Sequence, residues 1–193
     1  MRESRGFTLI EMVVVLAVIA ILAAVLTPII NSYVERARTN AAMNDLKNIA
    51  ASIVQFDADT KVWPIYKTNG DIPIGMTWPV EWTPGDTAGV DTSVQTDWNP
   101  ALTGGTSLDA MLNTNFLLLP TTGTRAWKGA YLNLGADPWG SAYYVTTGNL
   151  RPDSMNAAYV ISAGPNQKIE TPLNNVRSGT LIPSGDDLVI RIK

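Results

Sequence analysis

The hydrophobic residues of the chain are concentrated in one long run near its N-terminus. Residues 7–30 read FTLIEMVVVLAVIAILAAVLTPII, and only Thr8, Glu11, Thr27 and Pro28 depart from an apolar character. As a helix, these 24 residues would be about 36 Å long at about 1.5 Å per residue, which suffices to cross a hydrocarbon core of about 30 Å. The pattern therefore predicts one membrane-spanning helix.

The sequence around this helix predicts its orientation and argues against its removal as a secretory signal. Arg2 and Arg5 outweigh Glu3 ahead of the run, which favours a cytoplasmic N-terminus and places the rest of the chain outside the cytoplasm. A signal peptide needs small residues at positions −3 and −1 of its cleavage site. Between Val15 and Thr27, every small candidate for position −1 has valine, isoleucine or leucine two residues before it.

Glu11 distinguishes the run from a plain membrane anchor. Ionisable residues within membrane spans are costly and are commonly functional. If the chain is cut after Gly6, the new α-amino group of Phe7 also needs a partner of opposite charge. Pairing Phe7 of one copy with Glu11 of the next would satisfy both charges and fix the stagger between neighbouring helices.

These residues carry a family resemblance. The string RGFTLIE at residues 5–11, followed by an apolar run that includes Pro28, resembles the class III leader of type IV pilins and type II secretion pseudopilins. The resemblance implies that a prepilin peptidase cuts between Gly6 and Phe7 and methylates the new N-terminus on Phe7. It also implies that Glu11 and Pro28 act in filament assembly.

The spacing of apolar residues predicts that the helix continues to residue 59 as an amphipathic element. Apolar side chains recur there at three- and four-residue steps, and we expect this face to pack on the chain's own head. The face comprises Leu46, Ile49, Ile53 and Phe56. The first half of the helix, to about residue 41, is expected to pack on other subunits. Pro28 lacks a backbone donor and is expected to kink the helix or melt it locally.

The chain beyond the helix predicts a small, turn-rich head, and the whole chain is predicted to be of the α+β class. Eleven of the 12 prolines and 14 of the 15 glycines come after Asp59. A short helix is predicted near 108–119, and an antiparallel sheet with one face on the long helix is predicted from strands near 142–146, 157–162 and 188–192. The predicted parts are a leader at 1–6, a membrane-spanning and filament-core helix at 7–30, its amphipathic continuation at 31–59 and a head at 60–193.

A locally specified turn lies within the head. Asp137, Pro138, Trp139 and Gly140 suit a type I β-turn, and Trp139 is expected to lock the turn to the core. With the residues around it, this turn resembles the head of the major pseudopilin of type II secretion.

In that family the C-terminal loop binds calcium, so the resemblance implies a Ca²⁺ site. The residues that stand in the corresponding places are Asn166, Asp186 and Asp187. They offer the oxygen ligands that Ca²⁺ prefers. The alternative is that both segments are solvated turns before strands.

The insertion at residues 68–124 is the largest departure from the pseudopilin head. It contains six acidic residues, no lysine or arginine, and Trp78, Trp82 and Trp98. A major pseudopilin has a much shorter connection here. The tryptophans either form a surface for glycans or secreted clients, or are buried in a small satellite core.

Composition changes this picture mainly by exclusion. The chain has no histidine and no cysteine, which excludes Ser-His-Asp and Cys-His sites, imidazole zinc ligands and disulfides. A formal net charge of −3 without a Lys/Arg cluster does not indicate nucleic-acid binding. Asp186 and Asp187 are adjacent, and neighbours on a strand point to opposite faces, which argues against a hydrolase built on this pair. We predict no enzymatic activity.

The sequence therefore predicts a structural subunit of a type IV filament, held in the bacterial inner membrane with its head in the periplasm before assembly. The resemblance implies several partners: further copies of the chain, minor pilins or pseudopilins, the prepilin peptidase, and an assembly platform with its ATPase. The pseudopilin-like turn and the lack of cysteine favour a pseudopilus for protein export over a surface pilus for adhesion, motility or DNA uptake. A membrane-tethered binding module that uses the tryptophan-rich insertion is a further alternative.

Overall fold

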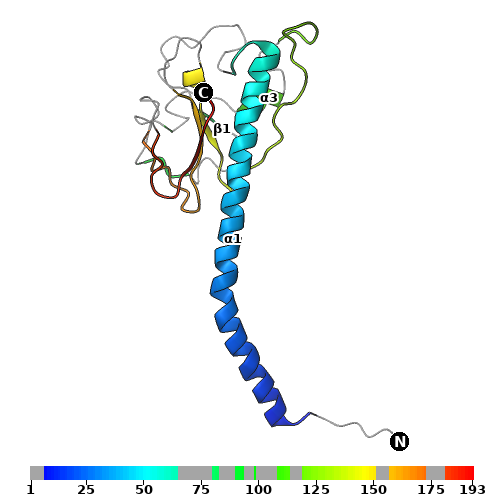
Figure 1. The fold of residues 1–193 in the computed structure, drawn as a ribbon, viewed down its shortest axis with the longest axis vertical. Coiled ribbons are helices and arrows are strands. Elements are labelled where there is room, and N and C mark those ends of the chain that lie inside the picture. Colours follow the sequence, from blue (N-terminus) through cyan, green and yellow to red (C-terminus); the bar gives the residue numbers. More distant parts are fainter. Residues whose placement is uncertain are drawn as a thin grey trace, which may run out of the picture. The chain divides into compact units, whose positions relative to one another are not determined.

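The computed structural model of the protein consists of one long helix followed by a sheet, short helical turns and loops (Figure 1). The described residues are 7–64, 80–82, 90–93, 98, 108–113, 119–150, 157–172 and 181–193. The chain divides into two compact units, Met1–Arg38 and Thr39–Lys193. The predicted α+β class is confirmed.

Helix α1, Leu9–Thr60, covers the predicted membrane-spanning run from its third residue onward and all of the amphipathic continuation. Among the described residues, it is the one helix that is long and apolar enough to cross a membrane. It continues through Pro28 without interruption, so the predicted local melting is wrong. A proline removes only one donor from a long helix, so the remaining backbone hydrogen bonds can maintain it. Figure 1 shows a gentle bend in the blue, N-terminal part of α1.

Within the described part of the chain, four short antiparallel strands form one sheet in the order β1-β2-β3-β4. The three predicted strands are confirmed with slightly shorter bounds: β2, Tyr144–Thr146; β3, Tyr159–Ser162; and β4, Leu188–Arg191. One register row joins Glu81, Val145, Val160 and Ile190 across the sheet. Strand β1, Val80–Trp82, was not predicted, because three residues between two nearby prolines are too few to show a strand pattern.

Two short helical segments complete the described elements. Helix α3, Leu108–Asn113, begins where a helix was predicted, and residues 114–118 of that prediction lie outside the described residues. The 3-10 helix η2, Thr147–Leu150, follows β2 directly.

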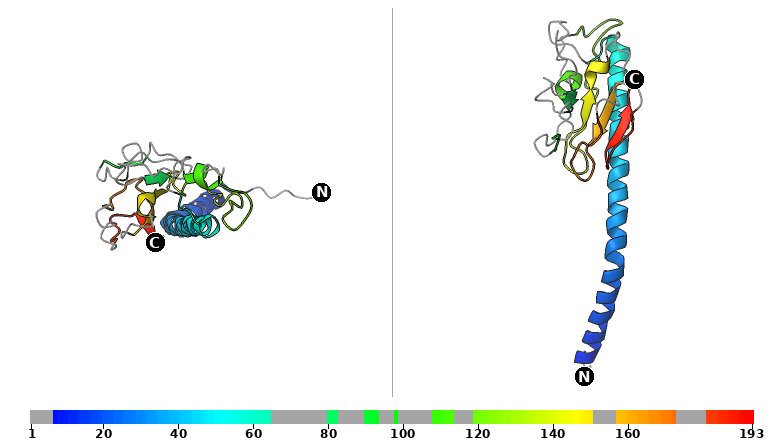
Figure 2. Two further views of the ribbon diagram at one scale, coloured as in Figure 1. Left: turned by 90° about the horizontal axis from the view of Figure 1, so that it is seen from above. Right: turned by 90° about the vertical axis from the view of Figure 1, so that its left-hand side faces the viewer.

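One face of the sheet packs on the C-terminal part of α1, as predicted. Figure 2 shows β2, β3 and β4 side by side along the cyan part of the helix. The predicted apolar face is confirmed, since Leu46, Ile49, Ile53 and Phe56 are fully buried. Alternate residues of the sheet segments join them in one apolar cluster: Tyr143, Val145, Ala158 and Val160. A period of two along a strand places these side chains on the same face.

The opposite face of the sheet is covered by residues from the insertion and from the segment after β3. Tyr144 and Ile161 form a second cluster there with Trp98, Val90 and Ile169. Trp98 is fully buried, which confirms the satellite core for this tryptophan. The other two tryptophans of the insertion lie outside the described side chains. Strands β2 and β3 are therefore buried on both faces, which explains the weak polar alternation in their sequences.

Candidate functional site

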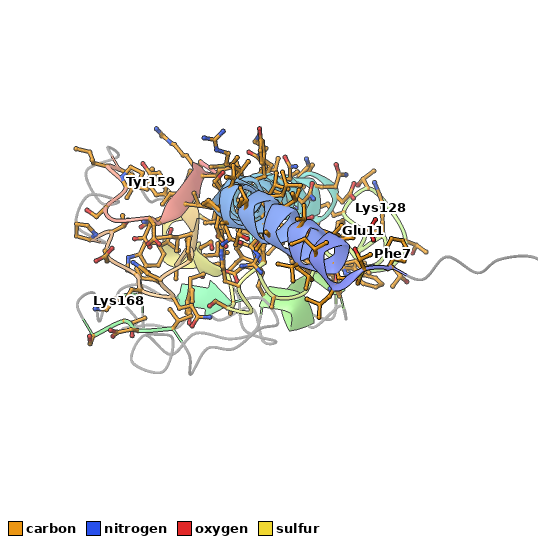
Figure 3. The ribbon with its side chains drawn as sticks, turned by 90° about the horizontal axis from the view of Figure 1, so that it is seen from below. Phe7, Glu11, Lys128, Tyr159 and Lys168 are labelled. Carbon is orange, nitrogen blue, oxygen red and sulfur yellow. The ribbon has the colours of Figure 1, made fainter. Side chains whose placement is uncertain are left out.

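Phe7 lies just before α1 and Glu11 lies in its first turn; the sequence predicted that both act in processing and assembly (Figure 3). Thr8 and Glu11 form a capping box. The backbone N–H and the hydroxyl of Thr8 donate to Glu11 Oε2 at 2.8 and 2.7 Å, and the N–H of Glu11 donates to Thr8 Oγ1 at 3.4 Å. The Glu11 carboxylate is therefore held in place by its own chain. Gly6 lies outside the described residues.

The N-terminal unit exposes every large apolar side chain from Phe7 to Val34. The exposed fractions range from 42% at Val34 to 84% at Phe7. Water-soluble proteins seldom expose so large a continuous apolar surface. This surface therefore needs lipid or other protein chains around it.

Asp137 organises the predicted turn in the head. The N–H of Gly140 donates to the carbonyl of Asp137 at 2.9 Å and closes the turn. Asp137 Oδ1 accepts from the N–H groups of Trp139 and Ser141 at 3.0 and 2.8 Å, and Oδ2 accepts from Ser162 Oγ at 2.8 Å. Burial raises the pKa of Asp137, although these hydrogen bonds favour its ionised form.

The predicted anchoring of this turn by Trp139 is wrong. Trp139 is only half-buried and belongs to neither apolar cluster of the described residues. Its carbonyl accepts from Gln167 Nε2 at 2.9 Å. The bonds of the nearly fully buried Asp137 carboxylate connect the turn to Ser162 at the end of β3. A buried, fully bonded carboxylate holds the turn more specifically than apolar contact would.

The two halves of the predicted calcium loop, 20 residues apart, lie together in the structure. The N–H of Asn166 donates to Asp186 Oδ2 at 3.0 Å. The backbone of Gly164 lies so close to the Asp186 carbonyl that a Cβ atom at residue 164 would collide with it. Gly164 also has a φ of 66°, which favours glycine. The contact therefore depends on a residue without a side chain at position 164.

Two carboxylate oxygens in this loop are buried without a hydrogen-bond partner among the described residues: Asp186 Oδ1 and Asp187 Oδ1. The other oxygen of Asp187 accepts from Glu170 N, Thr171 N and Thr171 Oγ1 at 2.9, 2.7 and 2.6 Å. Burial raises the pKa of Asp187, and the negative charge of Asp186 adds to this effect while the hydrogen bonds oppose it. Buried carboxylate oxygens without partners are costly.

Oxygen atoms of this kind suit Ca²⁺, which takes carboxylate, carbonyl and water ligands. The residues present therefore fit a calcium ion. The described residues contain no group of three or more acidic side chains placed to hold a metal. Most ligands would accordingly have to be backbone carbonyls or water. In the structure, Asn166 Oδ1 accepts from Lys168 N at 2.7 Å.

Sequence reasoning missed two residues of this loop, Glu170 and Thr171. The Glu170 carboxylate accepts from Asn166 Nδ2 at 3.3 Å and fills the space that a Cβ atom at Gly185 would need. Thr171 is fully buried and donates twice to Asp187. Both residues lie between the two predicted halves, and an isolated Glu-Thr pair is too common to have singled them out.

Comparisons with known proteins find one family model and several relatives that match part of the chain. Residues 1–27 match the family described as "Prokaryotic N-terminal methylation motif". The chain is 38% identical over 63 residues to type II secretion system core protein G of Pseudomonas aeruginosa, covering 33% of this chain and 44% of that protein. It is 31% identical over 68 residues to type IV major pilin protein PilE of Neisseria gonorrhoeae, covering 35% of this chain and 41% of that protein.

A longer match reaches beyond the N-terminal region. The chain is 28% identical over 159 residues to fimbrial protein Q of Moraxella bovis, covering 77% of this chain and 98% of that protein. The matches to the first two relatives span less than half of their lengths. No solved structure was found to match the chain.

Proposed function

Because the chain belongs to the family of type IV pilins and type II secretion pseudopilins, we propose that it is a structural subunit of a helical filament. The observation that carries the proposal is the exposed apolar surface from Phe7 to Val34, with the ordered carboxylate of Glu11 at its beginning. Lipid covers this surface while the subunit is stored in the membrane. Neighbouring copies of α1 cover it after assembly.

The proposed assembly begins with cleavage between Gly6 and Phe7 by a prepilin peptidase and methylation of Phe7. The subunit is held in the inner membrane by α1, with its head in the periplasm. An assembly platform and its ATPase then extract it, and minor subunits join the same filament. Glu11 receives the charged amine of Phe7 from the neighbouring subunit, which sets the stagger between subunits.

Within this family, we propose a pseudopilus of type II secretion. The likeness to core protein G and the acidic C-terminal loop support this assignment. A surface pilus is the second candidate, because the match to fimbrial protein Q spans almost the whole of that protein.

Deleting the gene in its host separates the two candidates. For a pseudopilus, we expect secreted enzymes to accumulate in the periplasm while surface pili remain in electron micrographs. For a pilus, the surface fibres disappear and secretion continues. The Glu11→Gln variant should fail to restore the lost property in either case, whereas normal restoration by this variant would contradict the proposed assembly contact.

We also propose that Asp186 and Asp187 hold a Ca²⁺ ion. The ion would neutralise two carboxylates whose Oδ1 atoms lack partners among the described residues, and it would connect the segments on either side of the loop. A ligand that binds only the folded state stabilises it by about 2.7 kcal/mol at a hundred times its Kd. Bound calcium would thus hold the two segments of the loop together, as a disulfide does in other proteins.

Removal of calcium is expected to lower the melting temperature of the head by several degrees, since the stabilisation by bound ligand is lost. The measurement is thermal unfolding of the full chain in detergent, with EDTA or with CaCl₂. In Asp187→Asn, which keeps an acceptor for Thr171 but removes the charge, calcium should have little effect. Asp57→Asn, at an acid of α1, is the matched control and should respond like the wild type. An equal response of Asp187→Asn and wild type would reject the site.

A further inference from the structure

We propose that Trp98, in the insertion, is a positioning residue for the cation-binding loop and acts through Thr171. The inference rests on the proposed calcium site but concerns a residue outside it. Trp98 Nε1 donates to the carbonyl of Thr171 at 2.9 Å, although the two residues are 73 positions apart in the sequence. Both residues are fully buried. The structure thus links an insertion of otherwise unexplained function to the acidic loop.

Thr171 connects Trp98 to Asp187 directly. The N–H and hydroxyl of Thr171 both donate to Asp187 Oδ2, at 2.7 and 2.6 Å, and its hydroxyl accepts from Ser184 N at 3.1 Å. The bond from Trp98 uses the carbonyl of Thr171, so the backbone and hydroxyl polar groups of this residue all have partners. Asp187 therefore has one oxygen fixed by the protein, and the other is left for a cation.

A second contact joins the insertion to the same loop. Asp91 pairs with residues 167–169 in a parallel bridge, with Asp91 N donating to Gln167 O at 2.9 Å and Ile169 N donating to Asp91 O at 3.1 Å. Lys168, labelled in Figure 3, is the one cationic residue of segment 162–172, and its Nζ lies 3.5 Å from Asp91 Oδ2. The insertion thus contacts the loop through two backbone hydrogen bonds and through an ion pair with Lys168.

This arrangement predicts a measurable coupling between the insertion and the cation. Outer partners that orient metal-ligating groups typically change metal affinity by about 10- to 100-fold when they are removed. The coupling is reciprocal, so a bound cation must also stabilise the contacts of Trp98. A purely structural role for Trp98 would change the stability of the calcium-free protein and leave its affinity for calcium unchanged.

The first test is calorimetric titration of CaCl₂ into the full chain, stripped of metal in detergent. Trp98→Phe keeps an aromatic ring but removes the N–H donor, and we expect it to raise the Kd for calcium about tenfold or more. Trp127→Phe is the matched control, because the indole N–H of Trp127 is buried without a hydrogen-bond partner among the described residues. This variant undergoes the same chemical change without losing a bond, so it should bind calcium like the wild type.

The second test compares the wild-type protein with and without calcium, and it does not depend on the folding of Trp98→Phe. Calcium is expected to slow hydrogen exchange in peptides that contain Asp91 or Trp98, and Asp187→Asn should abolish this protection. If the wild type binds no calcium, the cation site fails and the inference fails with it. If the wild type binds calcium, but Trp98→Phe has the same Kd and calcium leaves exchange around Trp98 unchanged, the inference alone is overturned.

Discussion

Replacement of Glu11 by glutamine is expected to leave a processed protein that accumulates in the membrane and forms roughly tenfold fewer filaments or none. Glutamine can replace glutamate in a capping box, so the first turn of α1 should survive through its bonds with Thr8. What the variant loses is the negative charge. Without it, the amine of Phe7 from the next subunit would be buried in the filament without a partner of opposite charge.

Two companion variants separate charge from helix capping. Thr8→Val removes the hydroxyl of the capping box but keeps the carboxylate of Glu11, so it should assemble better than Glu11→Gln. Glu35→Gln removes an acid from α1 beyond the apolar surface, where Glu35 forms an exposed ion pair with Arg38. Exposed pairs of this kind contribute little, so filaments should form normally. Electron microscopy and sedimentation of sheared filaments measure all three variants, and normal yield from Glu11→Gln would refute the charge argument.

Substitution of Asp137 by alanine is expected to destabilise the head by about 3 kcal/mol. Three donors lose their acceptor: the N–H groups of Trp139 and Ser141 and the hydroxyl of Ser162. Because the site is buried, water cannot replace the carboxylate without rearrangement. For a chain of this size, the loss corresponds to a fall in melting temperature of roughly 6 to 12 °C.

Asparagine at the same position provides the discriminating comparison. Burial raises the pKa of Asp137 in the folded state, so ionisation of this residue favours unfolding. The free energy of unfolding therefore falls as the pH rises from the pKa of the unfolded state to that of the folded state. Asp137→Asn keeps an acceptor for the turn without that cost and should therefore stay close to wild type at neutral pH. Asn133→Ala, an exposed change in the preceding segment, is the matched control and should shift stability by less than about 0.5 kcal/mol. Equal urea-unfolding midpoints for Asp137→Ala and wild type would contradict the proposed role of the turn.

Features with strong local signals could be predicted from the sequence. The buried face of α1 from Leu46 to Phe56 follows from a helical period, and the turn at Asp137 follows from residues that specify their own backbone. Strand β1 could not be found, because its three residues acquire their conformation from pairing with β2. A feature could be predicted when the contacts that determine it join residues close together in the sequence, and it was missed when they join distant residues.

The loop chemistry was only partly predictable for the same reason. The sequence indicated the acids at positions 186 and 187, but the bonds that orient Asp187 come from Thr171, and Thr171 is in turn held by Trp98. Contacts between residues that are 16 or 73 positions apart leave no periodic pattern in the sequence. The role assigned to Trp139 failed similarly, since its size indicated a core residue but the position of the core depends on the whole sheet.

The central claim is that α1 becomes the interior of a polymer after the chain is cut before Phe7. Intact-mass spectrometry of sheared, purified filaments tests it most directly, because it reads processing and assembly in one sample. The account predicts a chain that begins at Phe7 and carries one additional methyl group. Filaments built from chains that still begin at Met1 would contradict it, as would processed chains found only outside filaments.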